Sequence, residues 1–111
     1  MRRVTLAAAL LAGKGLDAAS TVVVLRLVES ARETVPLSRA LMAEFGQVGG
    51  MAVLTVLTMV VVGLLAESGV VIARVADDAP EWYVPTLRAA VYLGCAAWFG
   101  LVGVWNLTLL L

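Results

Sequence analysis

The chain of 111 residues has no histidine, one cysteine, three prolines and few charges. Without histidine it lacks the commonest protein ligand of metals and the usual proton shuttle near neutral pH. A single cysteine excludes an internal disulfide. Charged residues make up 14% of the chain, with eight basic and eight acidic side chains in balance. Since nucleic-acid binding needs a basic surface, we expect no nucleic-acid partner.

Catalytic groups are equally scarce. Without histidine there is no Ser–His or Cys–His arrangement. Lys14 and Ser20 do not form a Ser–Lys dyad, because on one helix their side chains point about 120° apart and are nearly two turns separated. The glycines form no phosphate-binding loop or dinucleotide-binding motif. We therefore expect a protein that is not an enzyme and that has no cofactor and no metal.

Apolar residues dominate what remains: 62% of the chain is hydrophobic and the mean hydropathy is +1.01. A helix needs about 20 mostly apolar residues to cross a bilayer. Three stretches meet this length, at about 4–28, 48–66 (with a possible extension to 75) and 84–111. The sequence therefore predicts an all-α integral membrane protein, a three-helix bundle forming one transmembrane domain over 1–111.

The segment between the first two spans has a helical pattern of its own. Pro36 suits a first helical position, and Leu37, Leu41 and Phe45 recur at spacings of four residues. Gly46 follows and is suited to end the helix. This pattern predicts a short amphipathic helix over about 36–45, which either lies in the headgroup region or packs on the bundle.

Aromatic and basic residues mark the expected membrane boundaries. Trp82 and Tyr83 begin the third span, and Trp105 lies about 34 Å further along a helix, close to the thickness of a bilayer. We interpret these three as interfacial anchors. Basic residues 2, 3, 74 and 88 fall on one side and 26, 32 and 39 on the other. An excess of one positive charge decides nothing under the positive-inside rule. We expect a multi-pass cell-membrane protein with its N-terminus in the cytoplasm.

A polar stripe interrupts the first span. Lys14, Asp17, Ser20 and Thr21 lie within about two turns, with Lys14 and Asp17 three residues apart. The two charges cost about 5–7 kcal/mol at mid-membrane, whereas the span's apolar residues return about 3–7 kcal/mol. The first helix is therefore marginal alone and needs a partner for this stripe. We expect Ser20 and Thr21 to donate to the Asp17 carboxylate.

Two interpretations of the stripe stay open. In the structural one, the Lys14–Asp17 pair fixes the rotation of the helix and docks on Thr55 or Thr58 of the second span. In the functional one, Asp17 binds or relays a cation, a proton or a substrate, because ionisable residues within membranes are often functional. The opposite charge on the same helix favours the structural interpretation.

Other polar residues receive simpler interpretations. Asn106 is expected to form a hydrogen bond between helices, near the outer end of the third span. Glu67, Arg74 and Arg88 are interpreted as snorkelling side chains and surface pairs.

A few motifs resemble a known group of proteins. Asp17 with Thr21, then Glu33-Thr34-Val35-Pro36-Leu37, then Trp105-Asn106-Leu107 resembles a family of small three-helix integral membrane proteins found largely in haloarchaea. Members have an aspartate in the first helix, a Glu-x-Asn-Pro-like motif after it and an Asn-Leu pair in the last helix; here Val35 replaces the asparagine. The resemblance implies the three-helix topology and singles out Asp17, Glu33, Pro36 and Asn106.

Three functions are compatible with these features. The leading hypothesis is a non-catalytic accessory or structural subunit of a larger membrane complex, since the bundle is small and its first span needs help. The alternative is a homo-oligomeric channel or small transporter that uses the Lys14, Asp17 and Thr21 stripe; three helices alone do not enclose a pore. The third is lipid or pigment binding in a groove beside Tyr92, Trp98 and Phe99.

Overall fold

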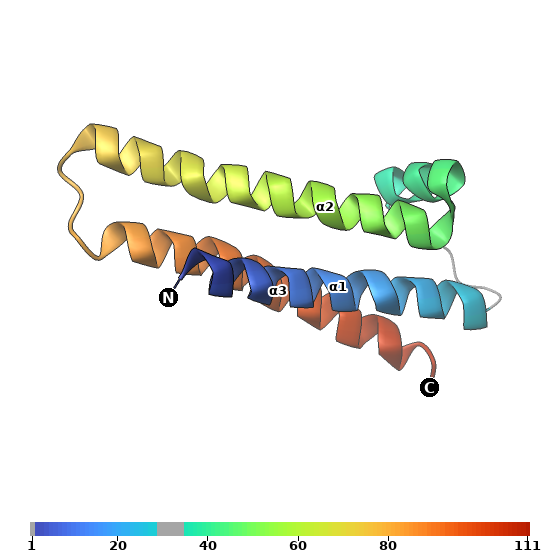
Figure 1. Ribbon diagram of the computed structural model, residues 1–111. Helices are drawn as coiled ribbons and strands as arrows, with labels where there is room; N and C mark the ends of the chain where they lie inside the picture. Colours follow the sequence, from blue (N-terminus) through green and yellow to red (C-terminus); the bar gives the residue numbers. More distant parts are fainter. Residues whose placement is uncertain (1, 29–34) are drawn as a thin grey trace.

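Three helices make up the computed structural model, which describes residues 2–28 and 35–111. They are α1 (Arg3–Leu27), α2 (Pro36–Ala76) and α3 (Tyr83–Thr108), with no strand in the described ranges. Helices α1 and α3 run in the same direction along the bundle. Helix α2, which lies between them in the sequence, runs in the opposite direction (Figure 1). The predicted all-α, three-helix class is confirmed.

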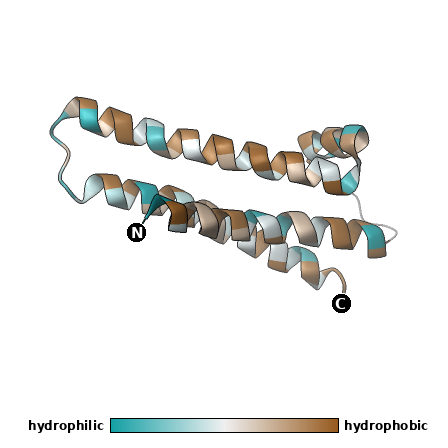
Figure 2. Ribbon diagram, in the orientation of Figure 1, coloured by the Kyte–Doolittle hydropathy of each residue, from teal (hydrophilic) through white to brown (hydrophobic). Residues whose placement is uncertain are grey.

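Each helix is long and apolar enough to cross a membrane, judged by length and composition. Hydrophobic residues cover most of the length of the helices, and hydrophilic ones gather towards the two ends of the bundle (Figure 2). The boundaries of α1 and α3 lie close to the predicted ranges 4–28 and 84–111. The second helix continues to Ala76, in line with the possible extension to 75, and it includes the predicted segment 36–45 because it begins at Pro36.

A sharp break divides α2 at Gly46, whose φ of 81° and ψ of 171° are not helical. This backbone region is essentially restricted to glycine. After the break, the chain packs closely against the helical segment before it. A Cβ on Gly50 would lie only 2.6 Å from the backbone nitrogen of Met42. Residues 36–45 are therefore helical as predicted and end at Gly46, but nothing in the structure supports their expected position at a membrane interface.

The closest helix packing joins α1 to α3. A Cβ on Gly13 would collide with the carbonyl oxygen of Ala96, and one on Gly103 would lie 2.9 Å from the carbonyl carbon of Leu16. Two glycines, one on each helix, thus let the backbones touch. In lipid, where no hydrophobic force drives helices together, such close approach is a main source of helix association.

The buried apolar core lies in the half of the bundle that holds the start of α1 and the turn between α2 and α3, which we call the closed half. Its centre consists of Leu6, Leu10, Val62, Ala66 and Tyr92. Leu10 and Ala66 have no exposed surface. All three helices contribute, so this half is filled by side chains.

An ion pair ties α2 to α3 in the closed half. The Arg88 guanidinium donates from Nε to Glu67 Oε1 at 3.0 Å and from Nη2 to Glu67 Oε2 at 2.9 Å. Arg3 of α1 lies 4.0 Å from the same carboxylate. Glu67 and Arg88 thus form a part-exposed charge pair of the expected kind, and its bidentate contact links two helices.

Candidate functional site

The other half of the bundle, which we call the open half, contains a cavity of about 710 Å³ between the three helices. Its walls come from the later part of α1, the first part of α2 and the later part of α3. Volumes between 300 and 1,000 Å³ are typical of sites for small molecules. The lining residues are Lys14, Asp17, Thr21, Val24, Leu25, Val35, Ser38, Met51, Leu54, Thr58, Trp98, Phe99, Val102, Trp105, Asn106 and Leu109.

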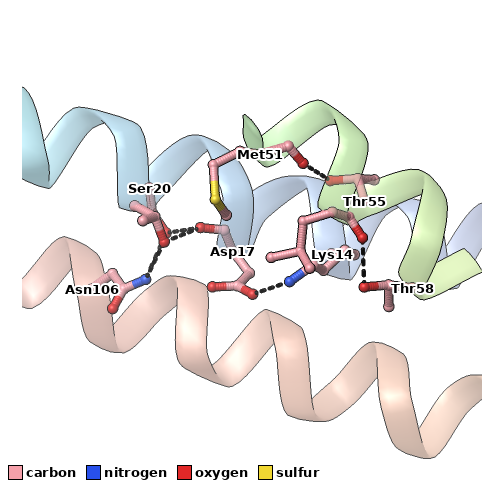
Figure 3. A network of polar contacts seen from close by, with 9 residues as sticks. Lys14, Asp17, Ser20, Met51, Thr55, Thr58 and Asn106 are labelled. Atoms are coloured by element: carbon pink, nitrogen blue, oxygen red, sulfur yellow. Dashed lines mark hydrogen bonds and ion pairs between the residues drawn. The ribbon is translucent and has the colours of Figure 1, made fainter. Parts of the chain in front are cut away.

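An ion pair forms the polar floor of the cavity. Lys14 Nζ donates to Asp17 Oδ2 at 2.8 Å, and both residues are buried, with exposures of 5% and 8% (Figure 3). The ammonium also lies 4.6 Å from the centre of the Phe99 ring on α3. A cation over an aromatic face is stabilised by the ring quadrupole, so α3 supports the charge that α1 introduces.

A second polar group joins α1 to α3 at the level of the next turn. Asn106 Nδ2 donates to Ser20 Oγ at 3.2 Å and to Thr21 Oγ1 at 3.1 Å. This is the hydrogen bond between helices that the sequence predicted for Asn106. The expectation that Ser20 and Thr21 donate to the Asp17 carboxylate is wrong: both hydroxyls donate to its backbone oxygen, at 2.9 and 2.8 Å. Such back-bonding within a helix is common for serine and threonine.

The predicted docking of the stripe on α2 does not occur. The hydroxyl of Thr55 donates to the backbone oxygen of Met51 and that of Thr58 to the backbone oxygen of Leu54, each at 2.8 Å (Figure 3). These hydroxyls are satisfied within their own helix. Thr58 does line the cavity, but α3 is the helix that supplies hydrogen bonds to the stripe.

Tryptophans form the rim of the cavity. Trp98 and Trp105 line it, although 66% and 67% of their surface is exposed. The predicted anchors Trp82 and Tyr83 lie at the other end of α3, with ring centres 6.2 Å apart. The structure thus separates Trp105, which is part of the cavity, from the other two anchors.

Within the motif that follows the first span, Val35 lines the cavity. Glu33 lies outside the described residues, and Pro36 is the exposed first residue of α2. Ser38, two residues further on, is buried at 3% exposure and lines the cavity.

The floor keeps hydrogen-bonding capacity that the described chain does not use. Asp17 Oδ2 accepts from Lys14, and no hydrogen bond to Oδ1 occurs within residues 2–28 and 35–111. The Lys14 ammonium has three N–H donors, of which one is taken by Asp17. The amide nitrogen of Asn106 is used twice as a donor, which leaves its oxygen as an acceptor. Donors and acceptors are therefore available side by side.

Several contributors to the site were not found from the sequence. The sequence places Phe99 and Trp98 only beside a groove, and it does not single out Ser38. The helical spacing of Trp98, Val102, Trp105 and Leu109 is a signal for a common face of α3. That spacing does not reveal whether the face meets lipid, protein or a cavity.

The comparisons with known proteins add no identity to this geometry. No family model matches the chain, and no curated protein or solved structure matches it either. The resemblance to the haloarchaeal three-helix family therefore stays a prediction. Within the described residues, no group of three or more cysteine, aspartate or glutamate side chains is arranged to hold a metal ion.

Proposed function

We propose that this chain is a non-catalytic membrane protein that binds a small molecule inside the bilayer, in the cavity of the open half. The observation that carries the proposal is the cavity of about 710 Å³, with a buried charged pair as its floor and two tryptophans at its rim. Burying Lys14 and Asp17 is expensive, and ionisable residues held within a membrane commonly mark functional sites.

The polar contacts of α1 favour ligand binding over an accessory subunit and over a channel. An accessory subunit is expected where the polar stripe of the first span needs partners; Asp17, Phe99 and Asn106 supply such partners within the chain. A channel through one copy would have to pass the closed half, where Leu10 and Ala66 have no exposed surface. A channel formed between several copies stays an alternative proposal, with the Lys14, Asp17 and Thr21 stripe as its candidate lining.

We keep the role of accessory subunit as a second proposal because of a groove on the outside of the bundle. A groove of about 420 Å³ between α1 and α2 is lined by small residues, among them Gly15, Ala18 and Ala19. Small residues at a helix surface allow a further transmembrane helix to approach closely. Native mass spectrometry of the protein in a gentle detergent tests this role: a larger, different subunit would support it, and the chain alone would contradict it.

We propose a cell membrane as the setting, with the N-terminus in the cytoplasm. The segment 36–45 is proposed to lie along the headgroup region. Its exposed Leu37 and Phe45, at 53% and 56%, are compatible with contact to lipid.

Extraction of co-purifying small molecules tests the binding role. The protein is isolated in mild detergent and its extract is analysed by mass spectrometry, for the natural chain and for two variants of α3. Val102→Phe fills part of the cavity, whereas Val104→Phe adds the same bulk at a position 53% exposed and outside the lining. We expect a bound molecule with the natural chain and Val104→Phe, and a clear loss with Val102→Phe. The proposal fails if extracts of all three are the same.

A further inference from the structure

The charge balance of the cavity defines what it selects. Among the sixteen residues of the described ranges that line it, Lys14 and Asp17 alone are ionisable, and they neutralise each other at 2.8 Å. A ligand with a net charge would add a third, unpaired charge at the middle of the membrane. Such a charge is strongly disfavoured in a low-dielectric site. The cavity is therefore suited to a neutral molecule.

The unused hydrogen-bonding atoms define the polar group of that molecule. Asp17 Oδ1 and Asn106 Oδ1 are acceptors, and the remaining N–H groups of Lys14 are donors. A partner for both kinds of atom must donate and accept through one small group. A hydroxyl does this, whereas an ether or ester only accepts.

The position of Trp98 and Trp105 at the rim indicates what the rest of the ligand is like. Close contacts between α2 and α3, Glu67–Arg88 and Gly69–Leu87 among them, lie in the closed half. In the open half these helices are separated by the cavity, and the exposed Trp98 and Trp105 stand at its edge. An aromatic rim at the lipid-facing surface admits a molecule that is already dissolved in the bilayer.

We propose that the ligand is a neutral lipid alcohol, a single hydroxyl on an apolar chain or ring system, with its hydroxyl between Asp17 and Lys14 and its apolar part leaving past Trp98 and Trp105. This inference rests on the proposed function. It adds that the cavity selects against charged amphiphiles and against alkanes.

Quenching of tryptophan fluorescence by brominated probes tests the selection. The full chain with Trp82→Phe, which leaves Trp98 and Trp105 as reporters, is placed in lipid nanodiscs. Four probes of equal chain length are titrated: bromoundecanol, bromoundecane, bromoundecanesulfonate and bromoundecyltrimethylammonium. We expect saturable quenching by the alcohol at a mole fraction about tenfold lower than for the charged probes, because of the unpaired charge. A similar margin of about tenfold is expected over the alkane, because it satisfies none of the polar atoms.

Substitutions of Lys14 and Asp17 are expected to change which probe binds best. Lys14→Met leaves the Asp17 carboxylate and is expected to favour the ammonium probe; Asp17→Leu leaves the lysine and is expected to favour the sulfonate. Because a single unpaired charge threatens folding, the double variant Lys14→Met/Asp17→Leu provides a further check. In it the alcohol is expected to lose its advantage over bromoundecane. Arg26→Met removes a charge outside the cavity and is expected to keep the natural preference.

The outcomes separate the two proposals. Saturable quenching by none of the probes overturns the proposed function and this inference with it. Equal binding of the alcohol and bromoundecane, or binding of a charged probe as tight as that of the alcohol, leaves the proposed function standing and overturns the inference. An advantage for the alcohol that survives in the double variant also overturns it, because the selection would then not arise at Lys14 and Asp17.

Discussion

The closed and open halves of this bundle are built from the same three helices but are held together differently. In the closed half, Leu6, Leu10, Val62, Ala66 and Tyr92 fill the interior, and a bidentate ion pair lies at its edge. In the open half, the helices surround a cavity, and the strongest contacts lie between α1 and α3. The apolar core thus lies in one half, and the polar groups that suit a ligand lie in the other.

The largest expected effect comes from breaking the ion pair at the border of the two halves. Lys14→Met leaves the buried Asp17 carboxylate without its partner, which we expect to destabilise the fold by about 3–5 kcal/mol. Unfolding by SDS in mixed micelles, followed by circular dichroism, measures this change. The double variant Lys14→Met/Asp17→Leu is expected to recover most of the loss. A single variant as stable as the natural chain would show that the pair is not buried.

Truncation in the closed core should have the next largest effect. Leu10 is fully buried, and we expect Leu10→Ala to cost about 2 kcal/mol, at the low end for leucines because lipid replaces water outside. Leu11→Ala is the matched control, since its side chain is half exposed and should change stability by about 0.5 kcal/mol or less. The same SDS titration compares the two. Equal effects would show that this core position contributes no more to stability than an exposed position on the same helix.

The ion pair between α2 and α3 should contribute less. A double-mutant cycle with Glu67→Gln and Arg88→Gln isolates the coupling between the two side chains. We expect a coupling of about 1 kcal/mol, because the hydrogen bonds are bidentate but 34% of the Glu67 side chain is exposed. Raising the salt concentration should reduce this value, and a coupling near zero would show that the pair does not hold the helices.

The smallest effect is expected on the α2 wall of the cavity. Thr58 donates within its own helix, so Thr58→Val should change stability by about 0.5 kcal/mol or less. If Thr58 instead docked on the α1 stripe, the loss would be clearly larger. Asn106→Leu provides the comparison, because its amide makes two hydrogen bonds to α1, and it should cost about 1–2 kcal/mol.

Sequence reasoning reached the features that depend on one helix at a time. The lengths of the apolar stretches predicted three spanning helices, and the spacing of Lys14 and Asp17 predicted their pairing. The depth of Asn106 predicted a bond to another helix, since polar amides within a membrane need partners. Each of these depends on helical geometry that is known in advance.

Features that depend on the rotation of neighbouring helices were not predicted. Glu67 lies 13 residues before Pro80 and Arg88 lies eight residues after it, and whether their side chains face each other is set by packing. The contact of Lys14 with Phe99 and the cavity itself also depend on how α3 is rotated against α1. The close packing at Gly13 and Gly103 depends on the same rotation.

The ion pair at Glu67 gives α2 the geometry of a lever. Its contacts with α3 are gathered near that residue, whereas Met51, further along α2, lines the cavity. At 1.5 Å per residue the arm between Glu67 and Met51 is about 24 Å long, so a tilt of about 5° would move its far end by about 2 Å. A small rotation about this pivot would change the width of the cavity while the closed half kept its packing.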